Sequence, residues 1–215
     1  TKKATQRVVE ILDANYEKAD LKAVVDATGP HLSLHDKNKL LELLKEFEEL
    51  FDGTLGDWRT EPVSFKLKEG AKPYHGRPYP DPKIRKETTI KELNRLCELG
   101  VTEFQPASEW ASPSFIIPKS DKTVCMISDF REVNKRLVRK PFPIPKISTV
   151  LQELEGFTFA TALDLNMGSY TIRLDPDASK ICTIIFPWGK YSYLRLLMGI
   201  AGSPDIFQAK MSELM

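Results

Sequence analysis

The sequence predicts an α+β fold, because segments with a helical hydrophobic period precede a series of short apolar runs separated by turns. Of its 215 residues, 41% are hydrophobic and 28% are charged, which is typical of a globular protein that buries a sizeable core. The 31 basic and 30 acidic residues give a net charge of +1, so global charge neither favours nor excludes a nucleic-acid partner. The widely spaced Cys97, Cys125 and Cys182 indicate a reducing, intracellular setting, and no apolar run reaches membrane-spanning length.

Two amphipathic helices are expected near the N-terminus. Apolar residues recur at helical spacing over 5–16 and, more strongly, over 36–51. Ser33 is placed to cap the second helix and Gly53 to end it. We interpret residues 1–60 as packing helices of a connector, without chemistry of their own.

The middle of the chain is expected to change from irregular structure to helix. Prolines recur over 60–82, where only 63–67 alternates as a short strand does. The dipeptide Asp81-Pro82 predicts a helix start, and Gly100 predicts the end of that helix.

The second half of the chain predicts mainly strands. A hairpin is expected to pair 115–117 with 124–127, and an apolar run over 157–163 leads to Asp164. Further strands are predicted over 172–174, 181–186 and 191–196, the last two joined by a turn at 187–190. Prolines make 141–145 an extended crossing. Helices are expected over 146–155 and from Ser203 onward. In the second of these helices, Ser203 would be the N-cap, Pro204 would take the first position and Asp205 would lie at the positive end of the helix dipole.

Four stretches, in this order, carry a family resemblance: WASPSF (110–115), SDFREVN (128–134), LDLNMG (163–168) and MGIAGSPDIFQ (198–208). Together they resemble the reverse transcriptase of gypsy-class LTR retrotransposons and, more distantly, of retroviruses. The match covers roughly residues 61–215.

The resemblance implies a right-hand polymerase fold with reverse-transcriptase-like fingers and palm. The fingers would take 61–138 and 172–203, and the palm about 139–171 and 204–215. Residues 1–60 resemble the connector that such polyproteins place between protease and polymerase. The palm would be incomplete, and its sheet would carry an exposed edge that favours self-association and poor solubility.

Asp164 is the candidate catalytic residue. A carboxylate that ends an apolar strand is costly to bury unless it binds a cation or accepts hydrogen bonds. The resemblance implies that Asp164 and the Leu165 carbonyl hold Mg²⁺, with Mn²⁺ as the alternative. Without the surrounding motifs, an aspartate that caps a turn would be the favoured interpretation.

The family's remaining carboxylates lie in a Tyr-x-Asp-Asp hairpin, which this sequence does not contain. One carboxylate cannot hold two metal ions in the clamp that nucleotidyl transfer requires. We therefore expect that the chain is truncated before this motif and does not polymerise by itself.

The resemblance also implies two sets of binding residues. The nucleotide-binding set is Lys119, Lys122, Ser169 and Met198, and the template-binding set is Asp129, Arg131, Asn134, Gly199 and Pro204. Three positions depart from the family pattern: Cys125 replaces an arginine, Ser169 an aromatic residue and Leu197 a proline. Cysteine lacks the permanently charged fork that grips a phosphate, so these departures are typical of a decayed copy.

The segment 131–146 is strongly basic. Arg136, Arg139 and Lys140 are candidates for additional phosphate contacts, which read no sequence and weaken with salt. The alternative is a solvated basic loop.

Several functions therefore remain open. The first is a fragment of an RNA-directed DNA polymerase, with template-primer, deoxynucleoside triphosphates and the rest of the Pol polyprotein as partners, in a cytoplasmic particle or the nucleus. The second is a non-catalytic nucleic-acid-binding relic, and the third is an interaction module built on residues 1–60. A phosphohydrolase is disfavoured, because the sequence has no second acidic cluster at workable spacing and no Gly-rich phosphate loop.

Overall fold

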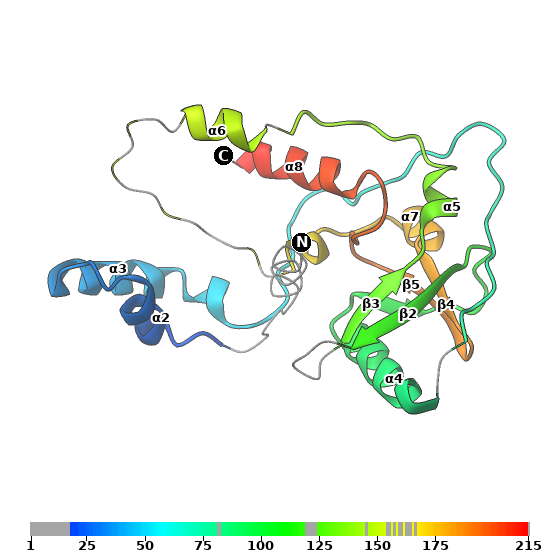
Figure 1. Ribbon diagram of the computed structural model, residues 1–215, viewed down its shortest axis with the longest axis horizontal. Coiled ribbons are helices and arrows are strands. Elements are labelled where there is room, and N and C mark those ends of the chain that lie inside the picture. Colours follow the sequence, from blue (N-terminus) through cyan, green and yellow to red (C-terminus); the bar gives the residue numbers. More distant parts are fainter. Residues whose placement is uncertain are drawn as a thin grey trace. The chain divides into compact units, whose positions relative to one another are not determined.

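The computed structural model describes residues 18–80, 83–118, 124–144, 146–153, 156, 158, 161, 165 and 167–214 (Figure 1). The chain forms two compact units, Thr1–Gly56 and Asp57–Met215. The division falls close to residue 60, where the sequence predicts a change from connector to polymerase-like segment. Among the described helices, none has the length and apolarity that crossing a bilayer requires.

The first unit is helical in its described part. It contains α2 (Leu21–Thr28), α3 (Leu34–Glu46) and a 3₁₀ turn, η1 (Glu48–Phe51). The sequence patterns did not predict α2, which is short and buries only two apolar side chains. The predicted helix over 5–16 lies outside the described residues.

The N-cap of α3 is confirmed, whereas its C-terminus is not where the sequence places it. The Ser33 hydroxyl accepts a hydrogen bond from the backbone N–H of Asp36, 3.2 Å away. The α-helix ends at Glu46 rather than at 51, because the Phe47 N–H turns back to the Leu44 carbonyl and a 3₁₀ turn follows. Gly53, with a φ of 82°, lies beyond that turn.

The second unit is built on one five-stranded mixed sheet. Its strands are β1 (Thr102–Phe104), β2 (Ser112–Pro118), β3 (Val124–Ser128), β4 (Thr183–Phe186) and β5 (Gly189–Tyr193). They lie in the order β1-β5-β4-β2-β3, and every pair is antiparallel except β2 with β4. The predicted hairpins β2–β3 and β4–β5 are confirmed, although β4 begins at Thr183 and β5 ends at Tyr193.

The helix α4 (Lys83–Glu98) packs on one face of this sheet (Figure 1). Leu93, Leu96 and Ile116 are almost fully buried in this layer. Gly100, with a φ of 66°, follows α4 and confirms the predicted helix end. The predicted start at Asp81-Pro82 lies outside the described residues.

The segment before α4 makes isolated bridges instead of the predicted strand over 63–67. Val63 pairs with Leu174, and Leu67 pairs with Leu137. Leu174 and Leu137 lie in different parts of the chain. The 63–67 segment therefore pairs with a different segment at each end and forms a continuous ladder with neither. Likewise, the predicted strand at 172–174 is reduced to bridges at Arg173 and Leu174.

Four shorter helices complete the unit: α5 (Arg131–Asn134), α6 (Ile147–Glu153), α7 (Pro176–Ile181) and α8 (Ser203–Leu214), together with a 3₁₀ turn, η2 (Gly168–Thr171). The sequence predicts α6 and α8 correctly but assigns part of α7 to a strand. Asp175 caps α7, and Pro176 occupies its first turn. This N-cap and proline signal is the same one that predicts α8.

The sequence predicts Ser203 as the N-cap of α8, but this prediction is wrong, because the helix already includes Ser203. It lies inside the first turn, where the Ile206 N–H bonds to the Gly202 carbonyl. Its buried hydroxyl has no hydrogen-bond partner among the described residues. The predicted palm strand over 157–163 lies almost entirely outside the described residues, so the palm sheet and its exposed edge remain predictions.

Candidate nucleic-acid interface

The turn between β3 and α5 carries a closely coupled ion pair. The Arg131 guanidinium donates to both carboxylate oxygens of Asp129, with Nε–Oδ1 at 2.8 Å and Nη2–Oδ2 at 2.6 Å. The Tyr79 hydroxyl donates to Asp129 Oδ2 at 3.2 Å. The arginine, followed by weaker contributions from its backbone N–H and Tyr79, lowers the pKa of Asp129 to about 2. Since 82% of the Arg131 side chain is exposed, Asp129 holds the guanidinium in place without removing it from solvent.

Asn134 joins the end of α5 to the loop before α8. Its Nδ2 donates to the Gly199 carbonyl at 2.8 Å, and its Oδ1 accepts from the Ala201 N–H at 2.9 Å. The two bonds fix the orientation of the amide, because one requires a donor and the other an acceptor. Two motifs that are 65 residues apart in the sequence are thereby held together.

Gly199 occupies a backbone conformation that favours glycine. Its φ is 103°, and a Cβ atom at this position would lie 3.4 Å from the ring of Phe130. Phe130 is 1% exposed and lies directly before α5. Any other residue at 199 would therefore be strained by this backbone conformation, while its Cβ atom would make an ordinary contact with Phe130.

These residues line a shallow pocket of about 340 Å³ in the second unit. Asp129, Arg131, Asn134 and Gly199 form its polar side. Its apolar side comes from the sheet face opposite α4, namely Phe115 and Ile127, together with Tyr79. Phe115 and Ile127 are direct cross-strand partners, and the rings of Tyr79 and Phe115 meet edge to face with centroids 5.7 Å apart.

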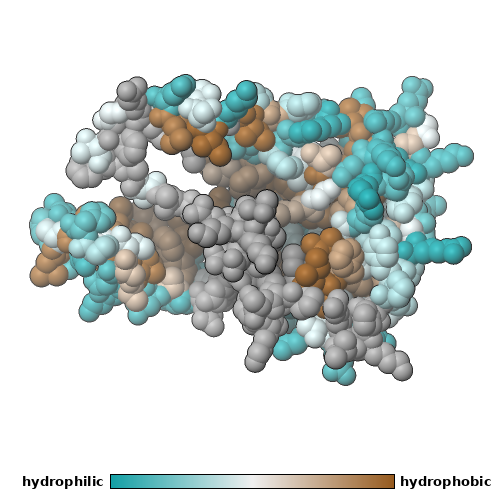
Figure 2. All heavy atoms as spheres, viewed as in Figure 1, coloured by the Kyte–Doolittle hydropathy of each residue, from teal (hydrophilic) through white to brown (hydrophobic). Residues whose placement is uncertain are grey.

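Tyr79, Phe115 and Ile127 line the pocket but were not predicted as site residues, although the strand pattern of β2 indicates that Phe115 is exposed. Alternate residues of β2 point to opposite faces, so Ile116 is buried under α4 while Phe115 and Ile117 are 38% and 48% exposed. Figure 2 shows apolar residues gathered over this hairpin. Exposed aromatic and branched side chains beside an arginine can support a nucleobase.

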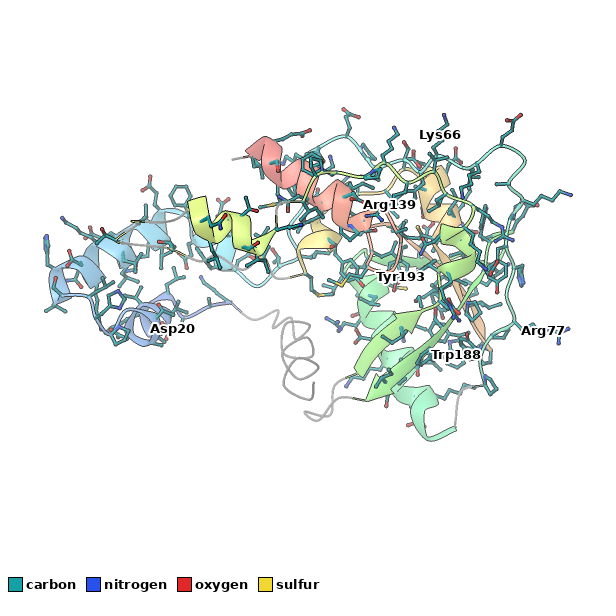
Figure 3. All side chains as sticks on the ribbon, turned by 45° about the horizontal axis from the view of Figure 1, so that its top comes forward. Asp20, Lys66, Arg77, Arg139, Trp188 and Tyr193 are labelled. Carbon is teal, nitrogen blue, oxygen red and sulfur yellow. The ribbon has the colours of Figure 1, made fainter. Side chains whose placement is uncertain are left out.

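A second ion pair fixes the start of α8. Asp205, whose side chain is 3% exposed, accepts from Arg139 Nε at 2.8 Å and from the Phe142 N–H at 3.1 Å. Arg139, which Figure 3 labels, lies on the extended crossing before α6. The arginine lowers the pKa of Asp205, as does the Phe142 N–H to a smaller degree. Asp205 was predicted to interact with the dipole of α8. In the structure it also accepts hydrogen bonds from Arg139 and from the Phe142 N–H.

The two arginines proposed for additional phosphate contacts are already engaged within the chain. Arg136 donates to the backbone carbonyls of Glu132 and Lys72, and its guanidinium lies 5.3 Å from the centre of the Tyr74 ring. Arg139 pairs with Asp205. Lys140 is exposed.

The other predicted site residues are placed as follows. Met198, which is 67% exposed, precedes Gly199, and Pro204 is an exposed residue in the first turn of α8. Ser169 lies half-buried in η2. A Cβ atom on Gly168 would lie 3.0 Å from the ring of Phe207, so η2 packs directly on α8.

The predicted catalytic and triphosphate-binding residues form the last group. Lys119, Lys122 and Asp164 lie outside the described residues, and the Leu165 side chain is 51% exposed. Within the described residues, no three His, Cys, Asp or Glu side chains gather as a metal site. The Mg²⁺ site therefore remains a prediction.

Comparison with known proteins supports a relationship to retroelement Pol proteins. The chain is 27% identical, over 97% of its length, to "Retrovirus-related Pol polyprotein from transposon 412" of Drosophila melanogaster. It is 28% identical, over 82% of its length, to the Pol polyprotein of transposon opus from the same organism. The chain spans 18% of each of these relatives. No family model matches it.

Solved structures show the same fold. The foamy viral protease-reverse transcriptase in complex with an RNA/DNA hybrid superposes with a TM-score of 0.75 over 91% of this chain, at 21% identity and covering 26% of that protein. The native prototype foamy virus enzyme gives a TM-score of 0.73 over 85% of this chain, at 24% identity and covering 25% of that protein. With its ordered motifs, its curated relatives and this fold, the chain belongs to the Pol proteins of retroelements and has the fold of a reverse transcriptase.

Proposed function

We propose that this chain holds the template strand of a gypsy-class, RNA-directed DNA polymerase at the pocket between β3, α5 and the Gly199 loop. The observation that carries the proposal is the convergence of two motifs on one pocket, through the Asn134 bridge. An exposed guanidinium stands at the mouth of this pocket, and an aromatic wall lines it. These features suit a nucleotide whose base rests on Phe115 and whose phosphate meets Arg131.

Catalysis is the further part of the proposal. Asp164, together with the Leu165 carbonyl, would bind Mg²⁺, and Lys119 and Lys122 would neutralise the triphosphate of the incoming nucleotide. Ser169 and Met198 would flank that nucleotide. The two-metal clamp needs more carboxylates than Asp164 alone, so we propose that these 215 residues bind a template without extending a primer.

Template binding is tested with a fluorescent primer-template that carries a single-stranded 5′ overhang. We expect binding that weakens with salt, and Arg131→Ala should lower the slope of log K against log salt by about 0.7, the value for one phosphate contact on a single strand. Arg59→Ala is the matched control, because Arg59 is an exposed arginine of the same unit outside the pocket. Equal effects of the two substitutions would reject the pocket as the binding site.

Catalysis is tested by primer extension on an RNA template with Mg²⁺ and deoxynucleoside triphosphates. We expect no extension by the 215-residue chain. Extension that Asp164→Asn abolishes would contradict the proposed need for further carboxylates.

A non-catalytic nucleic-acid-binding role is the second candidate. The observation that favours it is the set of departures from the family pattern at Cys125, Ser169 and Leu197. If Cys125→Arg and Ser169→Tyr, placed in a longer Pol chain with the remaining carboxylates, raised primer extension, these departures would account for lost activity. No gain would show that they do not limit it.

A further inference from the structure

We propose that a basic surface beside the pocket binds backbone phosphates of the single strand that continues from it. This inference rests on the proposed template-binding function and extends it by several nucleotides. The surface consists of five exposed basic side chains: Lys66, Lys68, Lys72, Arg77 and Lys135. We call it the ladder surface.

A short backbone ladder brings these residues together from two parts of the chain. The Lys68 N–H donates to the Arg136 carbonyl, and the Val138 N–H donates to the Lys66 carbonyl, both at 2.8 Å. Leu67 and Leu137 form the antiparallel bridge between them. Residues 66–68 and 136–138 are thus locked side by side, so the lysines have a fixed base instead of a loose loop.

Arg136 acts as the scaffold of this surface and is not itself a free cation. It reaches from the α5 side to the Lys72 carbonyl at 3.1 Å and lies over the Tyr74 ring. The Lys68 ammonium donates to the Lys135 carbonyl at 2.8 Å, which holds its charge beside the backbone at the end of α5. Through these contacts, Arg136 holds the 66–77 segment beside α5.

The charges of the ladder surface are mostly uncompensated. Within the described part of the chain, Lys66, Lys72 and Arg77 form no ion pair, and Lys135 pairs only with Glu132. Glu69 and Glu132 are the acidic residues within 66–77 and 131–138. Figure 3 shows Lys66 and Arg77 extending outward from the ribbon, and Figure 2 shows hydrophilic residues gathered around the position of α5.

Two connections make the ladder surface continuous with the pocket. Along α5, Arg131 lines the pocket and Lys135 follows four residues later, on the same side of the helical turn. Along the other segment, Lys72 lies beside Arg136, Arg77 follows, and Tyr79 forms part of the pocket wall. A strand that leaves the pocket past Arg131 therefore meets cations on both sides.

This continuity favours a nucleic acid over an acidic protein segment as the partner. Exposed lysines suit a repeating phosphate charge, whose binding releases counterions and tolerates any sequence. The aromatic side chains of the pocket can stack with a nucleobase, whereas the carboxylates of an acidic peptide cannot stack in this way.

The test compares single strands of two lengths in a salt titration by fluorescence anisotropy. The full chain and its triple variant Lys66→Gln, Lys68→Gln and Lys72→Gln would be measured with thymidine oligonucleotides of about four and about sixteen nucleotides. Loss of three phosphate contacts should lower the salt slope for the long strand by about 2 and leave the short strand, which fills only the pocket, unchanged. Circular dichroism checks that the variant folds.

The matched control removes the same charge elsewhere. Lys22, Lys39 and Lys45 are exposed lysines of the first unit, and their triple change to Gln lowers net charge equally. We expect this control to leave the long-strand slope unchanged. An equal loss in the control would overturn the proposal in favour of a general charge effect.

The outcomes separate this inference from the pocket itself. If Arg131→Ala weakens both strands while the ladder variant changes neither, the pocket stands and the ladder surface is refuted. If the ladder variant weakens the long strand while Arg131→Ala changes nothing, the surface stands without the pocket. Polyglutamate that displaces the long strand as effectively, per charge, as unlabelled oligothymidylate would refute the nucleic-acid assignment.

Discussion

Asp129 positions the exposed guanidinium of Arg131 and is itself charged over almost the whole accessible pH range. Its pKa of about 2 lies below the ordinary value of 3.8. A carboxyl whose pKa is lowered by folding stabilises the protein above its ordinary pKa, and this contribution is lost as the pH falls toward the folded-state value. The relevant window is therefore about pH 5 to pH 2.

We predict that Asp129→Asn makes the free energy of unfolding less dependent on pH in this window. Some dependence will remain, because Arg173 and Arg195 lower the pKa of Asp57 to about 2 as well. Urea unfolding at several pH values measures the effect, and Asp26→Asn, at a carboxyl that is 59% exposed, is the control. An unchanged pH dependence in Asp129→Asn would show that the Arg131 pair does not persist in solution.

Asn134 is the residue whose loss should separate the two motifs. Asn134→Ala removes two hydrogen bonds and leaves the Gly199 carbonyl and the Ala201 N–H without their partner, which should cost about 1–3 kcal/mol. We also expect weaker template binding, because the Gly199 loop loses its attachment to α5. Thermal unfolding and anisotropy measure the two effects. Stability and binding that both match the unsubstituted chain would contradict the bridge.

The loop that precedes α8 depends on its backbone conformation. Gly199→Ala places a Cβ atom at a φ of 103° and should destabilise the protein by about 1–2 kcal/mol. Gly202 in the same loop has no positive φ, and the nearest atom to its added Cβ lies 3.9 Å away. Gly202→Ala should therefore be close to neutral in chemical denaturation, and equal losses in the two variants would contradict this account.

At the scale of elements, the Asp205–Arg139 pair ties the extended crossing to α8. Removing Arg139 leaves a carboxylate that is 3% exposed without its cation, whereas removing Asp205 leaves an arginine that is already 56% exposed. We predict that Arg139→Ala destabilises more than Asp205→Ala, as measured by urea unfolding at neutral pH. The reverse order would show that Asp205 is better solvated than the structure indicates.

For the whole molecule, the division after Gly56 leads to a test of autonomy. Residues 57–215 contain the sheet, α4 and every described residue of the pocket and the ladder surface. We expect a polypeptide of residues 57–215 to unfold cooperatively and to bind the primer-template as the full chain does. Loss of binding in a folded 57–215 polypeptide would place part of the interface in the first unit.

The same comparison addresses the role of the first unit. Leu34, Leu43 and Leu50 are more than half exposed. If residues 1–56 form an interaction module, their deletion should abolish binding of a Pol partner while nucleic-acid binding persists. Co-purification of the two forms with the remaining Pol segments would measure this.

The fold class and both hairpins can be predicted from the amino-acid sequence, because they depend on local signals. Two short apolar runs separated by a polar turn predict β2 and β3. Ser33 and Gly100 mark helix ends through their own backbone preferences. Local motifs also predict Asp129, Arg131, Asn134, Gly199 and Pro204 as template-binding residues, and the first four of these line one pocket. That they bind a template stays a prediction.

Which residues meet cannot be predicted in this way, because such contacts depend on the pairing of segments that are distant in the sequence. The sequence predicts a strand over 63–67. In the structure this segment forms only two isolated bridges, from Val63 to Leu174 and from Leu67 to Leu137. Arg136 and Arg139 have the same charge as the exposed Lys135 and Lys140, which lie beside them in the sequence. In the folded chain, Arg136 lies over the Tyr74 ring and Arg139 pairs with the buried Asp205, whereas Lys66, Lys68 and Lys72 are exposed to solvent.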